Sequence, residues 1–186
     1  MKPPSLQVYV QTVHDLLAQE LRVEELVQKI TQAKCDLLQS PDAVAEEILA
    51  SSHRVGYSRH LLHADPQGRF VVMALVWNPG AVTPVHDHET WGVVGSFSSQ
   101  LQLIEFERDR EGSGLNETET GLLGAGEVVS LTPPRHSNIH QMKNSGDTRA
   151  VSIHTYGDTG TVCRIYNPSN GETTDKSLAF CNEAIC

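Results

Sequence analysis

The first fifty residues place their apolar side chains at helical spacing. In a first stretch these side chains recur every three or four residues, at Leu6, Val10, Val13 and Leu17. A second stretch keeps the spacing, at Leu26, Ile30 and around Leu37. Ser40-Pro41-Asp42 then has the features of a helix start, because serine caps, proline fits the first turn and an acid favours the N-terminal dipole. We therefore expect a helical segment over residues 5–50, with a third helix ending near Leu49.

From Tyr57 onward the pattern changes to short runs rich in β-forming residues. Phe70–Trp77 is an unbroken apolar run, closed by the turn signal Asn78-Pro79-Gly80. Further strands are expected at Thr90–Phe97, Leu101–Phe106, Glu127–Leu131, Ile139–Lys143, Ala150–Tyr156 and Val162–Tyr166. Many short strands separated by polar turns favour a β-sandwich or closed barrel over alternating βα units.

Length and charge narrow the class of protein. The chain has 186 residues, which fits one domain: a helical segment at 5–50, a β-barrel at about 55–170 and a tail at 171–186. Lys and Arg number 14 and Asp and Glu number 23, giving a formal net charge of −9. Such a chain has no basic surface for nucleic acid or for an anionic membrane.

Compartment and cysteine usage add two expectations. No apolar run approaches the roughly 20 residues that span a bilayer, and the N-terminus lacks the apolar core of a signal peptide. We therefore expect a cytoplasmic protein. The four cysteines form no C-x-x-C pair and are expected to be free thiols: Cys35, Cys163, Cys181 and Cys186.

Two histidines lie two residues apart in the string Pro84-Val85-His86-Asp87-His88. On an extended strand such residues point to the same face, with α-carbons about 7 Å apart. Both imidazoles can therefore reach one metal ion, while Asp87 points away. The pair alone fits equally well with two polar residues on an ordinary strand.

A second segment strengthens the metal hypothesis. Gly80-x₅-His86-x-His88 resembles the first cupin motif, and Gly126…Pro134-x₅-His140-x₃-Asn144 resembles the second. The two motifs occur in the right order within the strand-rich region. Together they predict a metal centre formed by His86, His88 and His140.

One position departs from the cupin pattern. Cupins usually place a glutamate ligand four residues after the second histidine, where this chain has Gly92, and Glu89 does not fit the spacing. The predicted ligands are thus three neutral imidazoles, which leave a charge of +2 on Fe(II) and favour an anionic ligand such as a thiolate. The same ligands also suit zinc, as in a hydratase, so they do not fix the metal.

A later strand carries a second group of polar residues. In Ser152-Ile153-His154-Thr155-Tyr156 the alternate residues Ser152, His154 and Tyr156 share one face. A hydroxyl, an imidazole and a phenol in line can form a hydrogen-bonded relay. A solvated strand face is the alternative explanation from the spacing alone.

Taken together, these segments resemble the cysteine dioxygenase family of thiol dioxygenases, including the bacterial 3-mercaptopropionate dioxygenases. The matching pieces lie within about residues 55–170 and comprise Tyr57–Leu62, His86–Gly95, His140 and Ser152–Gly157. The resemblance implies a mainly β fold, a cupin-type β-barrel (double-stranded jelly roll) with an N-terminal helical segment.

The resemblance also implies a reaction. Fe(II) would be the cofactor, and the partners would be dioxygen and a small thiol carboxylate, either cysteine or 3-mercaptopropionate. Both oxygen atoms would end on sulfur, giving a sulfinic acid without an external reductant. Tyr156 would hydrogen-bond near the oxygen and the thiolate, with His154 and Ser152 fixing its orientation.

Two further implications concern the substrate. Mammalian-type cysteine dioxygenases cross-link the matching tyrosine to a cysteine on the strand after H-x-H, but Gly92-Val93-Val94 offers no thiol, so we expect Tyr156 to be unmodified. Arg59 matches the carboxylate anchor of cysteine dioxygenases. Many 3-mercaptopropionate enzymes instead have glutamine there and an arginine after the relay strand, near the place of Arg164. Either arginine also fits a surface cation.

Two other classes of function stay open from the sequence. One is a zinc or nickel cupin that carries out isomerisation or hydration. The other is a non-catalytic cupin that binds or senses a small ligand. The row of Ser152, His154 and Tyr156 argues against a pure binder, because binding needs no proton relay. The sequence does not rank the thiol substrates or give the oligomeric state.

Overall fold

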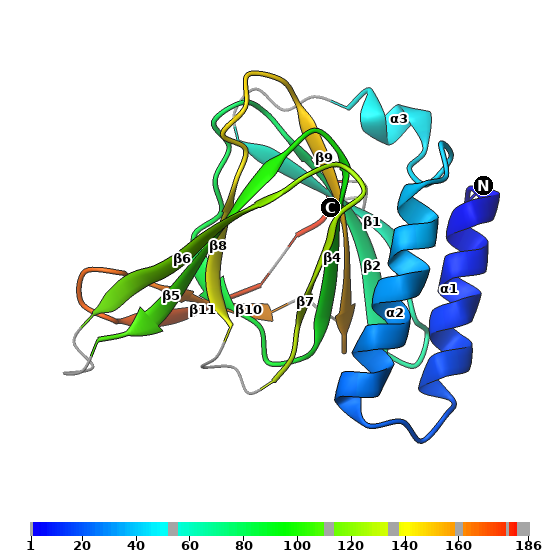
Figure 1. The fold of residues 1–186 in the computed structure, drawn as a ribbon, viewed down its shortest axis with the longest axis horizontal. Helices are drawn as coiled ribbons and strands as arrows, with labels where there is room; N and C mark the ends of the chain where they lie inside the picture. The colour runs from blue at the N-terminus through cyan, green and yellow to red at the C-terminus, as the bar shows by residue number, and fades with distance from the viewer. Residues whose placement is uncertain are drawn as a thin grey trace.

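The computed structural model describes residues 2–51, 56–109, 114–133, 138–158, 162–177 and 179–181. In this part of the chain three helices are followed by eleven strands (Figure 1). The helices are α1 (Pro4–Leu17), α2 (Val23–Leu38) and α3 (Glu46–Leu49). The strands are β1 (Tyr57–Ala64), β2 (Phe70–Trp77), β3 (Val85–Asp87), β4 (Gly92–Ser98), β5 (Leu101–Arg108), β6 (Leu115–Leu123), β7 (Val128–Leu131), β8 (Ile139–Lys143), β9 (Ala150–Gly157), β10 (Val162–Tyr166) and β11 (Thr173–Ser177).

The strands form two sheets in which every named pair is antiparallel. One sheet has the order β1-β2-β9-β4-β7, and the other has the order β11-β10-β3-β8-β5-β6. Helices α1 and α2 lie side by side against the outer face of the first sheet, and the second sheet lies on the opposite side (Figure 1). The predicted β-barrel with an N-terminal helical segment is confirmed.

Strand β2 is buried on both of its faces, which explains its unbroken apolar sequence. Val72 and Ala74 belong to the core between the first sheet and the helices. Met73 and Leu75 belong to the core between the two sheets. A strand that packs on both sides has no polar face, so its sequence does not alternate.

Strand β9 also has two buried faces, but they differ in chemistry. Ile153 packs in the helix-side core, with 0% of its surface exposed. The alternate residues Ser152, His154 and Tyr156 face the interior between the sheets, and all three are buried. A polar row inside a barrel requires hydrogen-bond partners, because an unpaired buried polar group costs stability.

Helix α2 inserts a lysine into the helix-side core. Lys34 is fully buried, and its Nζ donates hydrogen bonds to the backbone oxygen of Ile153 (3.2 Å) and to Oγ1 of Thr155 (2.8 Å). Its Nζ also lies 4.7 Å from the ring centre of Tyr9, whose hydroxyl is 2.8 Å from Thr155 Oγ1. Both bonds from Lys34 end on residues that flank His154 on β9.

The expected helix start at Ser40-Pro41-Asp42 is wrong. Residues 41–44 form turns and bends, and α3 begins at Glu46. The Asp42 carboxylate instead accepts a hydrogen bond from the backbone N–H of Ser5 in the first turn of α1 (3.2 Å). The acid therefore satisfies a free N–H of another helix, a tertiary contact that local sequence does not reveal.

Candidate metal centre and its pocket

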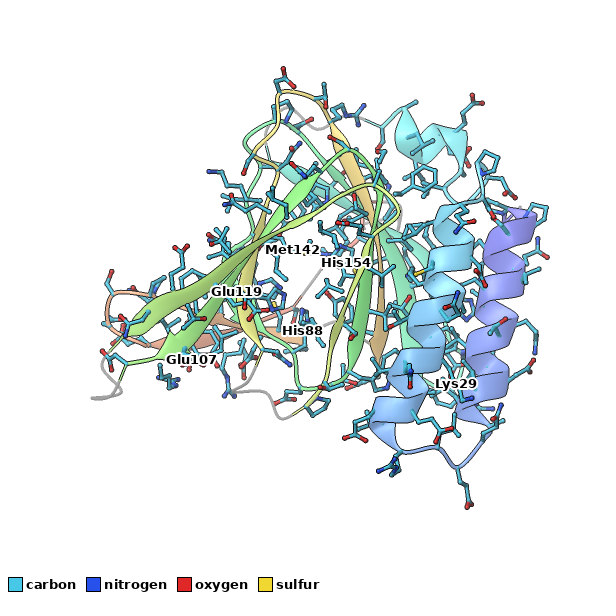
Figure 2. The ribbon with its side chains drawn as sticks, in the orientation of Figure 1. Lys29, His88, Glu107, Glu119, Met142 and His154 are labelled. Carbon is cyan, nitrogen blue, oxygen red and sulfur yellow. The ribbon has the colours of Figure 1, made fainter. Side chains whose placement is uncertain are left out.

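The three histidines predicted as ligands lie together in the interior. His86 is on β3, His88 follows that strand directly, and His140 is on β8, opposite His86 in the strand register. One ring nitrogen from each lies within 4.8 Å of the others. Figure 2 shows His88 in the space between the two sheets. Pro134 of the second cupin motif lies outside the described residues.

The outer nitrogens of two of these rings are held by backbone carbonyls. Nδ1 of His86 is 2.9 Å from the oxygen of Pro84, and Nδ1 of His140 is 2.7 Å from the oxygen of Asn138. A carbonyl can only accept, so Nδ1 carries the proton and Nε2 presents its lone pair to the interior. Burial also lowers the pKa of His86 to about 3 and lowers the pKa of His140. The rings are neutral, the form that binds a metal ion.

Asp87 lies between two of the histidines in sequence but points away from them. Its Oδ2 accepts a hydrogen bond from the hydroxyl of Tyr166 (2.5 Å). Gly92 stands where cupins usually supply a carboxylate and has no side chain to offer. In the described part of the chain, the cluster at this place consists of three imidazoles and no carboxylate.

A second cluster with metal-ligand chemistry lies between α1 and β1, where ligand atoms of His14, His63 and Asp65 also come within 4.8 Å. The guanidinium of Arg69 makes two bonds to the Asp65 carboxylate (2.8 and 3.0 Å) and one to Nδ1 of His14 (2.8 Å). Nζ of Lys2 is 2.6 Å from Nδ1 of His63. Two cations, Arg69 and Lys2, already bond to these groups, and Asp65 forms an ion pair with Arg69 at its centre.

A cavity of about 310 Å³ opens over two histidines of the triad. His86 and His88 line it together with Arg59, His154 and Tyr156. Apolar side chains form much of the remaining wall: Met73, Leu75, Met142 and Ile165. Figure 2 shows Met142 and His154 in the interior on either side of this space. The pocket thus combines candidate metal ligands, one cation and an apolar wall of a size that suits a small organic acid.

Hydrogen bonds connect the polar row on β9. Ser152 Oγ is 2.7 Å from Nε2 of His154, and Nδ1 of His154 is 3.1 Å from the hydroxyl of Tyr156. The indole N–H of Trp77, which can only donate, bonds to Ser152 Oγ (2.9 Å). When Ser152 donates to Nε2 and Nδ1–H donates to Tyr156, the hydroxyl proton of Tyr156 is available to the pocket; the other tautomer of His154 reverses both bonds.

The ring of Tyr156 is held against the metal centre. It stacks on the ring of His88, with 4.2 Å between centroids and 26° between planes. Burial raises the pKa of Tyr156 well above its usual range, so its hydroxyl stays protonated and can donate. A donor of this kind next to a metal site is suited to hold a developing negative charge.

The two predicted carboxylate anchors lie on different faces. Arg59 of β1 lines the pocket, and its Nη1 donates to the backbone oxygen of Ala179 (3.0 Å). Arg164 of β10 is not among the pocket-lining residues, and its Nε bonds to Asp175 of β11 (3.3 Å). Its strand neighbours Cys163 and Ile165 do line the pocket, so alternation turns Arg164 to the other face.

The sequence of this chain matches the profile of cysteine dioxygenase type I over residues 1–169. The chain belongs to the cysteine dioxygenase type I family. Curated relatives include cysteine dioxygenase type 1 of Danio rerio, 22% identical over 187 residues, and that of Homo sapiens, 23% identical over 184 residues. Each match covers 97% of this chain and 88% of the relative. The predicted family and the thiol dioxygenase class are thereby confirmed.

Solved structures with some likeness include a Cupin_2 domain of an XRE family transcriptional regulator from Enterobacter cloacae. It has a TM-score of 0.42 and 17% identity, covering 55% of this chain and 96% of that domain. Oxalate oxidase in complex with the substrate analogue glycolate has a TM-score of 0.44 and 14% identity. The match covers 73% of this chain and 67% of the oxalate oxidase chain. The cysteine dioxygenase family and the two antiparallel sheets together confirm the predicted cupin fold. No helix in the described part has the length and apolarity needed to cross a membrane.

Sequence reasoning missed three residues at this site. Trp77 supplies the donor that orders the polar row, and Asn138 supplies the carbonyl that orients His140. Lys176 lines the pocket from β11, in a segment that the sequence predicted to be a tail. Only Trp77 had a detectable signal, since a tryptophan at the end of a buried strand usually needs a partner for its N–H.

Proposed function

We propose that this protein is an iron(II)-dependent dioxygenase that converts a small thiol carboxylate into the corresponding sulfinic acid. The observation that supports this best is the convergence of three imidazoles, two of which line a pocket together with Arg59 and Tyr156. Membership of the cysteine dioxygenase family agrees with it. The preferred thiol, cysteine or 3-mercaptopropionate, is part of the proposal to be tested.

His86, His88 and His140 would hold the iron. When bound, iron(II) would bring thiolate sulfur and dioxygen together, so that both oxygen atoms are transferred to sulfur and no further electrons are required. Three neutral ligands leave the full charge of the ion uncompensated, which favours an anionic substrate over water. The apolar wall of Met73, Leu75 and neighbouring side chains would leave competing water few hydrogen-bond partners in the pocket.

Arg59 would anchor the substrate carboxylate. Its guanidinium makes one hydrogen bond to a carbonyl oxygen, so further N–H groups are available to bind a carboxylate with two parallel bonds. This interaction would fix the distance between carboxylate and sulfur. Orientation of this kind lowers the barrier by removing the freedom of the reacting groups before the reaction.

Tyr156 would donate its hydroxyl proton to the oxygen or sulfur atom on which negative charge develops. His154 and Ser152 would act through Tyr156, because their hydrogen bonds set the direction in which its O–H points. Trp77 would orient the same row from its far end. These roles require no net proton transfer along the row.

The direct test measures oxygen uptake and product with defined metal content. Protein freed of metal and reloaded with Fe(II) under argon is mixed with 3-mercaptopropionate, cysteine or cysteamine, and air is then admitted. We expect one dioxygen consumed for each sulfinate detected by mass spectrometry, with a mass increase of two oxygen atoms. Protein reloaded with zinc and the His140→Ala variant are the matched controls, and both should be inactive.

The same experiment tests the other functions considered. Thiol-independent turnover of another substrate by the zinc or nickel form would support a hydratase or isomerase. Thiol binding without oxygen uptake in the iron form would support a ligand-binding cupin. Either result would contradict the proposed dioxygenase.

A further inference from the structure

The charge of the pocket is opposite to that of the whole chain. The protein carries a formal net charge of −9, yet none of the described residues that line the pocket is an aspartate or a glutamate. Two of them, Arg59 and Lys176, are cations. They come from distant elements, β1 in one sheet and β11 at the edge of the other. A cationic pocket in an acidic protein indicates an anionic ligand.

Strand register places the side chain of Lys176 on the pocket face. In the antiparallel pair of β10 and β11, Lys176 lies directly opposite Cys163, and Asp175 lies directly opposite Arg164. Directly opposed residues share a face of the sheet. Cys163 lines the pocket, whereas Arg164 and Asp175 bond to one another on the other face. Lys176 therefore projects from the edge strand over the pocket.

Neither pocket cation forms an ion pair with an acidic side chain among the described residues. Arg59 bonds to the carbonyl oxygen of Ala179, and Lys176 has no ion pair among the described residues. Two arginines outside the pocket, Arg69 and Arg164, each bind an aspartate. Two unpaired cations in one pocket leave two positions at which a ligand could supply the missing negative charge.

The two cations act on a common point of the pocket wall. Cys163 is 5% exposed, and burial raises the pKa of its thiol; the charges of Arg59 and Lys176 lower this pKa, whereas those of Asp87 and Asp175 raise it. Both positive groups are therefore near this side chain. A ligand that reaches from one cation to the other would pass across Cys163, above the histidine triad.

We infer that Lys176 forms a second anion subsite and that the pocket takes thiols carrying two carboxylates, one bound by Arg59 and the other by Lys176. Mercaptosuccinate has this chemistry, whereas 3-mercaptopropionate has one carboxylate, and cysteine adds an ammonium that would face two cations. The inference rests on the proposed function, and the reaction is the same: thiolate and dioxygen give a sulfinate.

The test separates binding from turnover. Iron-loaded protein is titrated under argon with mercaptosuccinate and with 3-mercaptopropionate, and heat is recorded. In the wild type we expect tighter binding of mercaptosuccinate. Lys176→Met should weaken it about fivefold, which corresponds to about 1 kcal/mol for one partly exposed ion pair, and should change the binding of 3-mercaptopropionate less than about twofold. Lys176→Glu should weaken mercaptosuccinate further.

Lys29→Met is the matched control, because Lys29 lies on the outer surface of α2, paired with Glu25, and its loss changes the net charge equally (Figure 2). This variant should bind both thiols like the wild type. Circular dichroism verifies that each variant is folded. The second subsite would be overturned if the wild type bound the two thiols with equal affinity. It would also be overturned if Lys176→Met and Lys176→Glu each weakened the binding of both thiols by the same factor.

Admitting air to the same samples tests the reaction by itself. If sulfinate forms but Lys176→Met leaves the ratio of the affinities for mercaptosuccinate and 3-mercaptopropionate unchanged, the dioxygenase is supported and the role of Lys176 is contradicted. Selective binding of mercaptosuccinate without oxygen uptake would support the second subsite and contradict the dioxygenase.

Discussion

Gly92 on β4 lies directly opposite Tyr156 on β9, and the tyrosine ring fills the space that a side chain at position 92 would need. A β-carbon added at Gly92 would lie 2.6 Å from Cε1 and 2.7 Å from Cδ1 of that ring. Gly92 is also the position where cupins usually supply a carboxylate ligand. The absence of a fourth protein ligand and the stacking of Tyr156 on His88 therefore depend on the same glycine.

Gly92→Ala should displace the Tyr156 ring. The contact is too short to be absorbed without movement, so we expect a loss of about 1–3 kcal/mol in the free energy of unfolding and at least about tenfold slower sulfinate formation. Iron content should stay near one per chain. Gly121→Ala is the control, since a β-carbon there meets nothing within 4 Å. Urea unfolding measures the loss of stability, and steady-state turnover measures sulfinate formation. Wild-type values of both in Gly92→Ala would show that the Tyr156 ring is not displaced.

Tyr156→Phe should impair the reaction but not the metal site. Removing one hydrogen-bond donor from the reacting atoms should slow sulfinate formation by about tenfold to a thousandfold and leave oxygen uptake in excess over product. Tyr166→Phe removes a hydroxyl from the opposite side of β3 and should keep this coupling. Peptide mass spectrometry of the wild type should show an unmodified Tyr156. Normal coupling in Tyr156→Phe would remove it from the reaction.

The pair of arginines allows a direct comparison of anchors. Arg59→Ala should lower kcat/KM for 3-mercaptopropionate by roughly 30-fold to several thousandfold, the range for losing a charge partner that costs about 2–5 kcal/mol. Cysteamine, which has no carboxylate, should be affected much less. Arg164→Ala should resemble the wild type with both thiols, because Arg164 faces Asp175. The opposite pattern would move the anchor to Arg164.

Metal binding should stabilise the fold through the histidine triad. A metal present at 100 times its dissociation constant adds about 2.7 kcal/mol, which raises Tm by roughly 5–10 °C in a protein of this size. Chelation should remove this increment, and His140→Ala should lack it. His14→Ala alters the ion-pair cluster instead and should keep it. Loss of the increment in His14→Ala alone would place the ion at that cluster.

Lys34 should make the stability of the protein depend on pH. Burial lowers the pKa of Lys34 well below its usual range, whereas in the unfolded chain it is about 10.4. Between these values folding releases a proton, so the free energy of unfolding rises with pH in this window, by up to about 1.4 kcal/mol per pH unit. Urea unfolding at pH 7 and pH 9.5 should show this rise in the wild type and in Lys29→Met but not in Lys34→Met. The same change in unfolding free energy with pH in all three proteins would contradict this role of Lys34.

Local spacing was sufficient to predict which side chains lie together at the site. His86 and His88 share a strand face at an interval of two, and the row Ser152, His154, Tyr156 follows the same rule, so both groups could be read without a structure. That His140 joins the first group required the second cupin motif. The hydrogen-bond partners Trp77 and Asn138 depend on pairing between distant strands, which leaves no periodic signal.

The sequence did not predict β1, although its burial alternates, nor two strands that have almost no buried face, β6 and β11. All five residues of β11 are exposed, and β6 buries only its final residue, Leu123. Hydrophobic alternation arises from burial on one side, so a polar edge strand resembles a loop in sequence. Lys176 was missed for this reason, although its neighbour in the register, Cys163, lay in a strand that was predicted correctly.

The exposure of β11 gives the protein a way to change substrates in evolution. The hydrogen-bonded row lies on β9, a strand packed on both sides, where most substitutions reduce stability. An exchange at position 176 touches no core and should be almost neutral for folding, yet it alters the charge over the pocket. Related enzymes can therefore diverge in the acids they accept while the oxidation itself is inherited intact.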